Sequence, residues 1–175
     1  MGHQIQRQAS PTLDIIDGHP DMAYTLASSL READKKEVLA VYDIDPDNLA
    51  HALADSIQLA IKEDGYVHGI VSGVGEDKRL IGLFGYGDFS TDRLYPNGCI
   101  WLVSTDELFE KHALTTTKIF IRYLLPQLLL KYGSVGNYVL AENHVHIDWL
   151  TMCGFRKEHT RVIGKEPFIL MRRDL

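Results

Sequence analysis

Apolar and polar positions follow a helical period through the first third of the chain. From Pro20, apolar residues recur every three or four positions, which predicts one helix up to a polar break at residues 43–47. The face of this helix that we expect to turn inward carries Ala23, Leu26, Ala27, Leu30, Ala33 and Val38. A short strand, Leu13–Ile16, precedes the helix.

A second helix is expected after the break. Asp45 is placed to cap it, and Pro46 suits its first position, where a missing backbone N–H costs nothing. The helix should end at residues 64–65. Its expected inward positions are Leu49, Ala52, Leu53, Ile57, Ala60 and Ile61.

The middle of the chain changes to strand patterns. Two apolar, glycine-rich runs, Tyr66–Gly75 and Leu80–Asp88, are joined by a polar turn at residues 76–79, which is typical of a β-hairpin. The pair Asn97-Gly98 introduces a third strand, Cys99–Val103.

Helices and strands alternate in the last part of the chain. A helix should start near Thr115–Thr117 and continue through Leu130, with a kink at Pro126. The elements expected after it are a strand Tyr138–Ala141, a helix Val145–Met152, and strands Arg161–Gly164 and Phe168–Met171. A strand–helix–strand crossover requires at least one parallel pair. The sequence therefore predicts an α/β fold.

Length and composition fit one soluble domain. The chain has 175 residues, 45% of them hydrophobic, and shows neither repeats nor a linker. We expect a polar tail at residues 1–11 and a single domain at 12–175. The formal net charge of −6, without a basic block, disfavours nucleic-acid binding.

No segment predicts export or membrane insertion. The N-terminal residues lack the apolar core of a secretory signal. The strongest apolar stretch, Ile119–Leu130, is short and contains Arg122, Pro126 and Gln127, so we expect no membrane span. The two cysteines, Cys99 and Cys153, are expected to be buried free thiols in a reducing cytoplasm.

The segment from Asn143 to Phe155 carries the sharpest resemblance to a known family. An Asn at a strand end, one short helix and a Gly-Phe pair resemble the corresponding segment of the GNAT N-acetyltransferases. Gly154 suits the left-handed position that ends a helix, Phe155 should pack beneath it, and Asn143 leaves polar groups for a ligand. The resemblance implies the GNAT-like acyl-CoA N-acyltransferase fold, a mixed central sheet with helices on both faces.

In that fold the strands at Trp101 and Tyr138 should lie side by side and parallel, and should diverge at their C-terminal ends. The opening between them would admit the pantetheine arm of acetyl-CoA, the implied cofactor. Backbone groups of Leu102 and Val103 would extend the sheet onto that arm, and Asn143 would bind it.

A second resemblance concerns tailed phages. The order and spacing of several segments resemble a GNAT-like family that includes the small internal virion or morphogenesis protein of short-tailed phages. These segments are Arg31–Val38, Trp101–Leu108, Asn137–Val139, Asn143 and Trp149-Leu150, and the resemblance covers most of the chain from about Leu26. It implies a phage-encoded protein located in the host cytoplasm or associated with the virion.

The sequence departs from the enzyme pattern at two places. Active GNAT enzymes normally have a Gln/Arg-x-x-Gly-x-Gly/Ala loop between the fourth strand and the following helix, and this loop holds the pyrophosphate of coenzyme A. The stretch from Ser104 to Lys118 has no glycine. Its candidate substitutes are Thr115, Thr116, Thr117 and Lys118. Many GNAT enzymes also place a Tyr seven residues after the Asn, where this chain has Leu150.

Asp34 and Glu37 are the candidate catalytic residues. They fall on the inner stripe of the first helix, where a carboxylate needs a partner. One interpretation is structural, because such carboxylates often pair with Arg or cap a loop; the other is that they line the acceptor cleft, bind an amine or act as a general base. Glu142, His144 and His146 lack convincing ligand spacing, so we expect no metal site.

Three hypotheses about function follow. The first is an acyl-CoA-dependent N-acyltransferase that acts on an unknown amine. The second is a non-catalytic phage virion or morphogenesis protein that retains the fold, and the two departures favour it. The third is a phage-borne enzyme that modifies a host or virion protein. The fold by itself does not distinguish among them.

Overall fold

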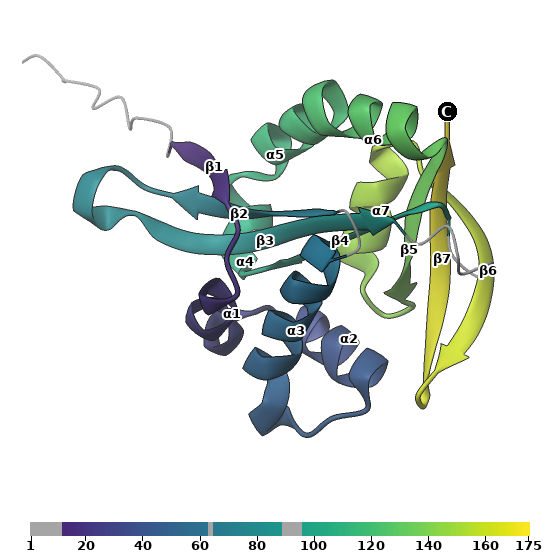
Figure 1. The fold of residues 1–175 in the computed structure, drawn as a ribbon, viewed down its shortest axis with the longest axis horizontal. Coiled ribbons are helices and arrows are strands. Elements are labelled where there is room, and N and C mark those ends of the chain that lie inside the picture. Colours follow the sequence, from purple (N-terminus) through teal and green to yellow (C-terminus); the bar gives the residue numbers. More distant parts are fainter. Residues whose placement is uncertain (1–11, 63–64, 89–95) are drawn as a thin grey trace, which may run out of the picture.

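The computed structural model describes residues 12–62, 65–88 and 96–175; the predicted tail, residues 1–11, lies outside them. These residues form a seven-stranded mixed sheet in the order β1-β2-β3-β4-β5-β7-β6, with helices on both faces (Figure 1). The strands are β1 (Leu13–Asp17), β2 (Tyr66–Ser72), β3 (Arg79–Asp88), β4 (Gly98–Ser104), β5 (Ser134–Leu140), β6 (Arg156–Ile163) and β7 (Glu166–Asp174). The helices are α1 (Asp21–Leu26), α2 (Glu32–Tyr42), α3 (Leu49–Lys62), α4 (Asp106–Lys111), α5 (Ala113–Ile119), α6 (Leu125–Tyr132) and α7 (His144–Met152).

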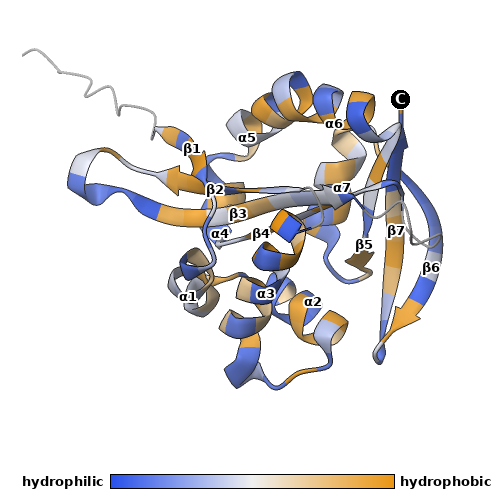
Figure 2. Cartoon of the chain, in the orientation of Figure 1, coloured by the Kyte–Doolittle hydropathy of each residue, from blue (hydrophilic) through white to orange (hydrophobic). Residues whose placement is uncertain are grey.

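Each face of the sheet has its own hydrophobic core. On one face, α1, α2 and α3 pack over Val67 and Leu83. On the other, α4, α6 and α7 pack over Ile100 and Val139. Apolar positions, orange in Figure 2, accordingly occur along the central strands and on the helices beside them.

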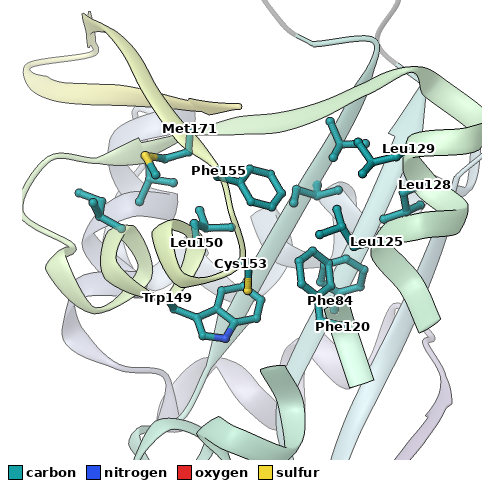
Figure 3. Packing of buried hydrophobic residues seen from close by; sticks show 14 of the residues in the cluster. Phe84, Phe120, Leu125, Leu128, Leu129, Trp149, Leu150, Cys153, Phe155 and Met171 are labelled. Atoms are coloured by element: carbon teal, nitrogen blue, oxygen red, sulfur yellow. The ribbon is translucent and has the colours of Figure 1, made fainter. Parts of the chain in front are cut away.

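An aromatic cluster fixes the helices of the second face. The Phe120 ring contacts Phe84 of the sheet at 5.6 Å and Trp149 of α7 at 5.2 Å between ring centroids. Phe155, which follows α7, stacks on Phe120 at 6.3 Å (Figure 3). Such contacts position α7 firmly against the sheet.

The parallel pair in the middle of the sheet opens after its first residues. β4 and β5 are parallel neighbours, and their register contains only Gly98 opposite Val135 and Cys99 opposite Gly136. All other neighbouring strands pair antiparallel. The prediction of parallel neighbours that diverge at their C-terminal ends is confirmed.

The predicted cap of α7 is also confirmed. Gly154 has a φ of +85°, and Phe155 is buried. The Phe155 N–H donates to the Leu150 carbonyl at 3.0 Å, a bond that satisfies one of the free carbonyls of the last helical turn.

The prediction of one continuous helix from Pro20 was wrong. α1 ends at Leu26, and Leu30 and Arg31 are extended, with ψ of 148° and 144°. The reason is tertiary, because the Arg31 N–H donates to the Ser104 carbonyl at the end of β4 at 2.9 Å. α2 therefore starts afresh at Glu32, against the open end of the sheet.

Details of the second helix also differ from prediction. Pro46 does take the first position of a 3₁₀ turn before α3, but the Asp45 side chain makes no capping hydrogen bond. Ile61, expected inward, is 51% exposed, whereas its neighbour Ala60 is buried, so the last turn of α3 turns Ala60 and not Ile61 toward the core.

The stretch between β4 and the long helix is helical, which the sequence analysis did not predict. α4 begins at Asp106, directly after β4, and α5 begins at Ala113 instead of Thr115. Thr105 occupies the cap of α4 and two acidic residues its first turn, and Leu108 is buried. This pattern is a helix-start signal that the sequence analysis missed.

Pro126 is accompanied by a π turn. Residues Phe120–Leu124 form this wider turn, in which the Leu125 N–H donates to the Phe120 carbonyl. The π turn lies immediately before α6, where Pro126 lacks an N–H for the regular ladder.

Candidate active site

α2 lies across the gap between β4 and β5 and takes the place of a strand partner for each. Asp34 Oδ2 accepts the Ser104 N–H of β4 at 2.8 Å. One helical turn later, Glu37 Oε2 accepts the Leu140 N–H of β5 at 3.1 Å. The two predicted carboxylates therefore meet in one site, each bonded to one of the diverging strands.

Asn143 joins the two carboxylates. It precedes α7, and its Nδ2 donates to Asp34 Oδ1 at 3.3 Å and to Glu37 Oε2 at 3.2 Å. Its Oδ1 accepts from Arg31 Nη2 at 3.1 Å and caps α7 through the His146 N–H. The polar cluster thus spans α2, the end of β5 and α7.

Arg31 neutralises part of the negative charge of this cluster. It is 7% exposed, with Nη1 3.6 Å from Asp34 Oδ1 and Nε 3.7 Å from Asp106 Oδ1. Its guanidinium carbon also lies 4.7 Å from the centroid of the Phe109 ring. The sequence analysis did not select Arg31 as a site residue.

His146 is a buried, neutral member of the cluster. Burial first, and then the charge of Arg31, lower its pKa to about 3. Its Nδ1 lies 3.1 Å from the donor Asn143 Nδ2, so we assign the ring proton to Nε2. Within the described residues, this buried Nε2 has no hydrogen-bond partner, and Asp34 Oδ1 lies 3.7 Å from it.

Both carboxylates hold protons more tightly than usual. Burial raises the pKa of Asp34 from 3.8 to about 6, against the opposing charge of Arg31. Burial also raises the pKa of Glu37 from 4.5 to about 7. Glu37 is therefore poised to gain or lose a proton near neutral pH.

Two cavities meet at the gap. The larger, which we call the α2–α3 cavity, has a volume of about 190 Å³ and lies between these helices and the opened strands. The smaller, the α7 cavity, has about 30 Å³ and is lined by His146, Trp149 and Leu150. Glu37, Trp101, Leu102 and Asn137 line both cavities, so the two cavities border the same gap.

The backbone of β4 offers unpaired groups to this gap. The Thr105 N–H bonds to Ile81 on the β3 side, whereas Ser104 bonds through its N–H and carbonyl to α2. Backbone groups point alternately to the two sides of such a strand. Leu102 therefore directs its N–H and carbonyl into the gap, and Val103 directs its own toward β3.

The other predicted site residues lie on α5, apart from the cluster. The Thr116 N–H bonds to the His112 carbonyl inside the helix. Thr117 Oγ1 donates to the Ala113 carbonyl at 2.6 Å and accepts from Trp149 Nε1 at 2.8 Å. Thr115 and Lys118 are exposed. Thr115, Thr116, Thr117 and Lys118 line neither of the two cavities.

The pantetheine half of an acyl-CoA fits this site, whereas the glycine cradle for its pyrophosphate is missing. Leu102, which lies beyond the paired residues of β4 and β5, and the unpaired Nε2 of His146 border the gap. Between Gly98 and Gly133 the sequence has no glycine. The first turn of α4 instead carries two carboxylates, which repel phosphate.

Solved structures show which fold this is. A spermidine N-acetyltransferase from Vibrio cholerae, in complex with CoA and spermine, is 14% identical, with a TM-score of 0.61 over 93% of this chain and 95% of that one. A GCN5-related N-acetyltransferase from Kribbella flavida is 14% identical, with a TM-score of 0.61 over 93% and 98%. AAC(6')-Ib in complex with ribostamycin and coenzyme A is 10% identical, with a TM-score of 0.63 over 93% of each chain.

The chain therefore has the fold of the GNAT acyl-CoA N-acyltransferases, as the sequence predicted. Identities this low establish the fold alone. No family model and no curated protein matches the sequence. Among the helices that the structure describes, none is both long and apolar enough to cross a membrane.

Proposed function

We propose that this protein is an acyl-CoA-dependent N-acyltransferase that acetylates a primary amine. The observation that carries the proposal is the gap between β4 and β5, which connects two cavities through the carboxylate of Glu37. A nucleophile arriving from one face and a thioester arriving from the other would meet beside that carboxylate. The fold supports the same activity by analogy.

Glu37 is the proposed general base. Its pKa of about 7 lets it accept a proton at neutral pH and release that proton again. The bound thioester supplies an activated acyl carbon. The nucleophile is the neutral amine, so a bound ammonium group first releases one proton to water. As the nitrogen then forms its bond to this carbon and the C–S bond breaks, Glu37 takes the second proton from the nitrogen.

Other groups of the chain position the reactants. Leu102 would hold the pantetheine arm through its backbone, and Asn143 would fix Glu37 through the hydrogen bond from Nδ2. The Nε2 proton of His146 would stabilise charge that develops on the acyl oxygen. Leu150 has no proton to give, so the departing thiolate takes its proton from water.

Lys118 is the proposed contact for the phosphates of the donor. It is exposed on α5, and with Thr115 it offers side-chain groups in place of a glycine cradle. An attraction that rests on exposed charge is weak and is screened by salt. We therefore propose weak, salt-sensitive binding of acetyl-CoA.

A second candidate is a non-catalytic phage virion or morphogenesis protein that keeps this fold in the host cytoplasm. The observation that favours it is α4, which fills the position of the glycine loop with an acidic helical turn. The burial of Leu150 where many GNAT enzymes have a Tyr fits the same interpretation. A phage-encoded enzyme that acts on a host or virion protein combines both proposals.

Calorimetric titration with acetyl-CoA tests the proposal. We expect weak binding whose affinity falls as salt is raised. Lys118→Glu should weaken it further, whereas Lys157→Glu, the same change on β6, should not. Asn143→Ala should weaken binding without altering the salt dependence.

Two results would change these proposals. If millimolar acetyl-CoA produces neither heat nor thermal stabilisation, the acyltransferase proposal is refuted and the non-catalytic morphogenesis protein is favoured. Tight, salt-insensitive binding would mean that the phosphates are held by groups other than Lys118.

A further inference from the structure

The α2–α3 cavity is mainly apolar, and its lining has one carboxylate beside the neutral polar residues Tyr42, Ser56, Asn137 and Tyr138. Its walls come from α2, α3, β4, β5 and the end of β6, and Glu37 is the single lining residue of the described chain that is charged near neutral pH. The apolar part of the lining consists of Val38, Val41, Leu53, Leu59, Ala60, Trp101, Leu102, Val103 and Ile163. The lining is therefore that of a hydrophobic pocket with one anionic group.

The size of the cavity suits a ring-sized apolar group. Its volume of about 190 Å³ exceeds that of cavities of about 150 Å³ that are known to admit benzene. At its rim, Tyr42 of α2 and Ser56 of α3 share a hydrogen bond between their hydroxyls. This hydrogen bond links α2 to α3 at the rim, and Glu37 lines the part of the cavity next to the gap.

We propose that this cavity receives the acceptor of the reaction, and that the acceptor is a primary amine with a single positive charge on an apolar, ring-sized body. The inference rests on the proposed function. The apolar body would fill the space between α2 and α3, and the ammonium group would pair with Glu37 beside the gap.

Two other occupants fit less well. A polyamine carries several positive charges, and the single carboxylate of this lining would leave the others buried without a partner. A long acyl chain of the donor would fill the apolar walls, but it would leave Glu37 facing hydrocarbon. A single amine satisfies both the walls and the carboxylate.

The charge that Glu37 presents depends on its neighbours. On its own helix it faces Asp34 and the fixed positive charge of Arg31. From β5 and α7 it faces hydrogen-bond donors, the Leu140 N–H and Asn143 Nδ2, with neutral His146 behind them. The other titratable residues of the lining are Tyr42, Cys99 and Tyr138, and burial raises the pKa of the Cys99 thiol to about 12.

Binding of such an amine should strengthen as pH rises. With a pKa of about 7, Glu37 is about 10% ionised at pH 6 and about 97% ionised at pH 8.5. An ammonium group remains charged throughout that range. The dissociation constant of the amine should therefore fall about tenfold between pH 6 and pH 8.5.

The test is calorimetric titration of the protein alone with 2-phenylethylamine, 2-phenylethanol and spermidine at pH 6 and pH 8.5. We expect the amine to bind best at pH 8.5, with the alcohol and spermidine weaker. Glu37→Gln should weaken amine binding at pH 8.5 at least about tenfold, remove its pH dependence and leave the alcohol unaffected.

A second pair of variants tests the cavity without touching the carboxylate. Leu59 lines the cavity and is 42% exposed, so Leu59→Trp should fold and should narrow the space. This variant should weaken the amine and the alcohol alike. Ile61→Trp, on the same helix but outside the lining, should change neither.

Four results would overturn the inference. The first is the absence of amine binding at millimolar concentration, and the second is equal binding of amine and alcohol that Glu37→Gln leaves unchanged. The third is tighter binding of spermidine than of 2-phenylethylamine. The fourth is tighter binding of octanoyl-CoA than of acetyl-CoA, abolished by Leu59→Trp, because the cavity would then hold the acyl chain. Since the amine titration contains no donor, acetyl-CoA binding without amine binding would leave the proposed function standing.

Discussion

Replacing Glu37 with Gln should remove the contribution of this carboxyl group to the pH dependence of the free energy of unfolding. The carboxyl has a raised pKa in the folded protein, about 7 against 4.5, and burial is the main cause. Below pH 4.5 the group is protonated in both the folded and the unfolded protein, so it costs nothing. As pH rises from 4.5 to about 7, the carboxyl of residue 37 loses its proton in the unfolded chain but keeps it in the folded protein. The free energy of unfolding therefore falls until Glu37 also ionises in the folded protein.

The size of the effect follows from the two pKa values. A gap from 4.5 to about 7 is worth about 3 kcal/mol in total, of which about 2.5 kcal/mol develops between pH 5 and pH 8. Gln keeps an oxygen that can accept the Leu140 N–H but never ionises. Relative to wild type, Glu37→Gln should therefore become more stable by about that amount as pH rises from 5 to 8.

Urea unfolding followed by tryptophan fluorescence at pH 5, 6, 7 and 8 measures this difference. The matched control is Glu32→Gln, the same change on the same helix at an exposed position that pairs with Lys35. Its stability should parallel wild type. If Glu37→Gln also parallels wild type over this range, the carboxylate is not desolvated and the reasoning about its proton is refuted.

Two further predictions concern the packing of α7. Gly154→Val should lower the free energy of unfolding by more than the about 1 kcal/mol that a generic substitution costs, because φ is +85° and a Cβ there meets the Arg173 side chain. An unchanged melting temperature would contradict the cap. Thr117→Val should cost about 1–3 kcal/mol in thermal unfolding because it leaves Trp149 Nε1 without its acceptor, whereas Thr117→Ser should cost less. Equal effects of Val and Ser would contradict the role of that hydrogen bond.

The order of strands and helices could be predicted because each element has a local pattern. The hairpin of β2 and β3 follows apolar, glycine-rich runs around a polar turn, and Gly154 marks the end of α7. The break at Arg31 has no such local signal, because its cause is a hydrogen bond to Ser104, far away in the sequence. α4 has a local helix-start signal, Thr105 followed by two acidic residues. It was missed because this stretch was compared with the glycine loop of GNAT enzymes.

The site could be predicted in part. The helical period placed Asp34 and Glu37 on one inner stripe, and the structure brings them to Asn143. Arg31 and His146 were missed as members of the cluster. Each lies three positions from a predicted member, a spacing that pairs side chains at the start of a helix, and could have been found in that way.

The two carboxylates of α2 have a consequence for the kinetics of ligand entry. Because Asp34 and Glu37 occupy the N–H groups at the ends of β4 and β5, side chains of the protein itself hold the two strands apart. A ligand that enters the gap needs no preceding separation of the strands. Its association should therefore appear as a single exponential phase whose rate rises linearly with ligand concentration, without the plateau that a slow opening step would impose.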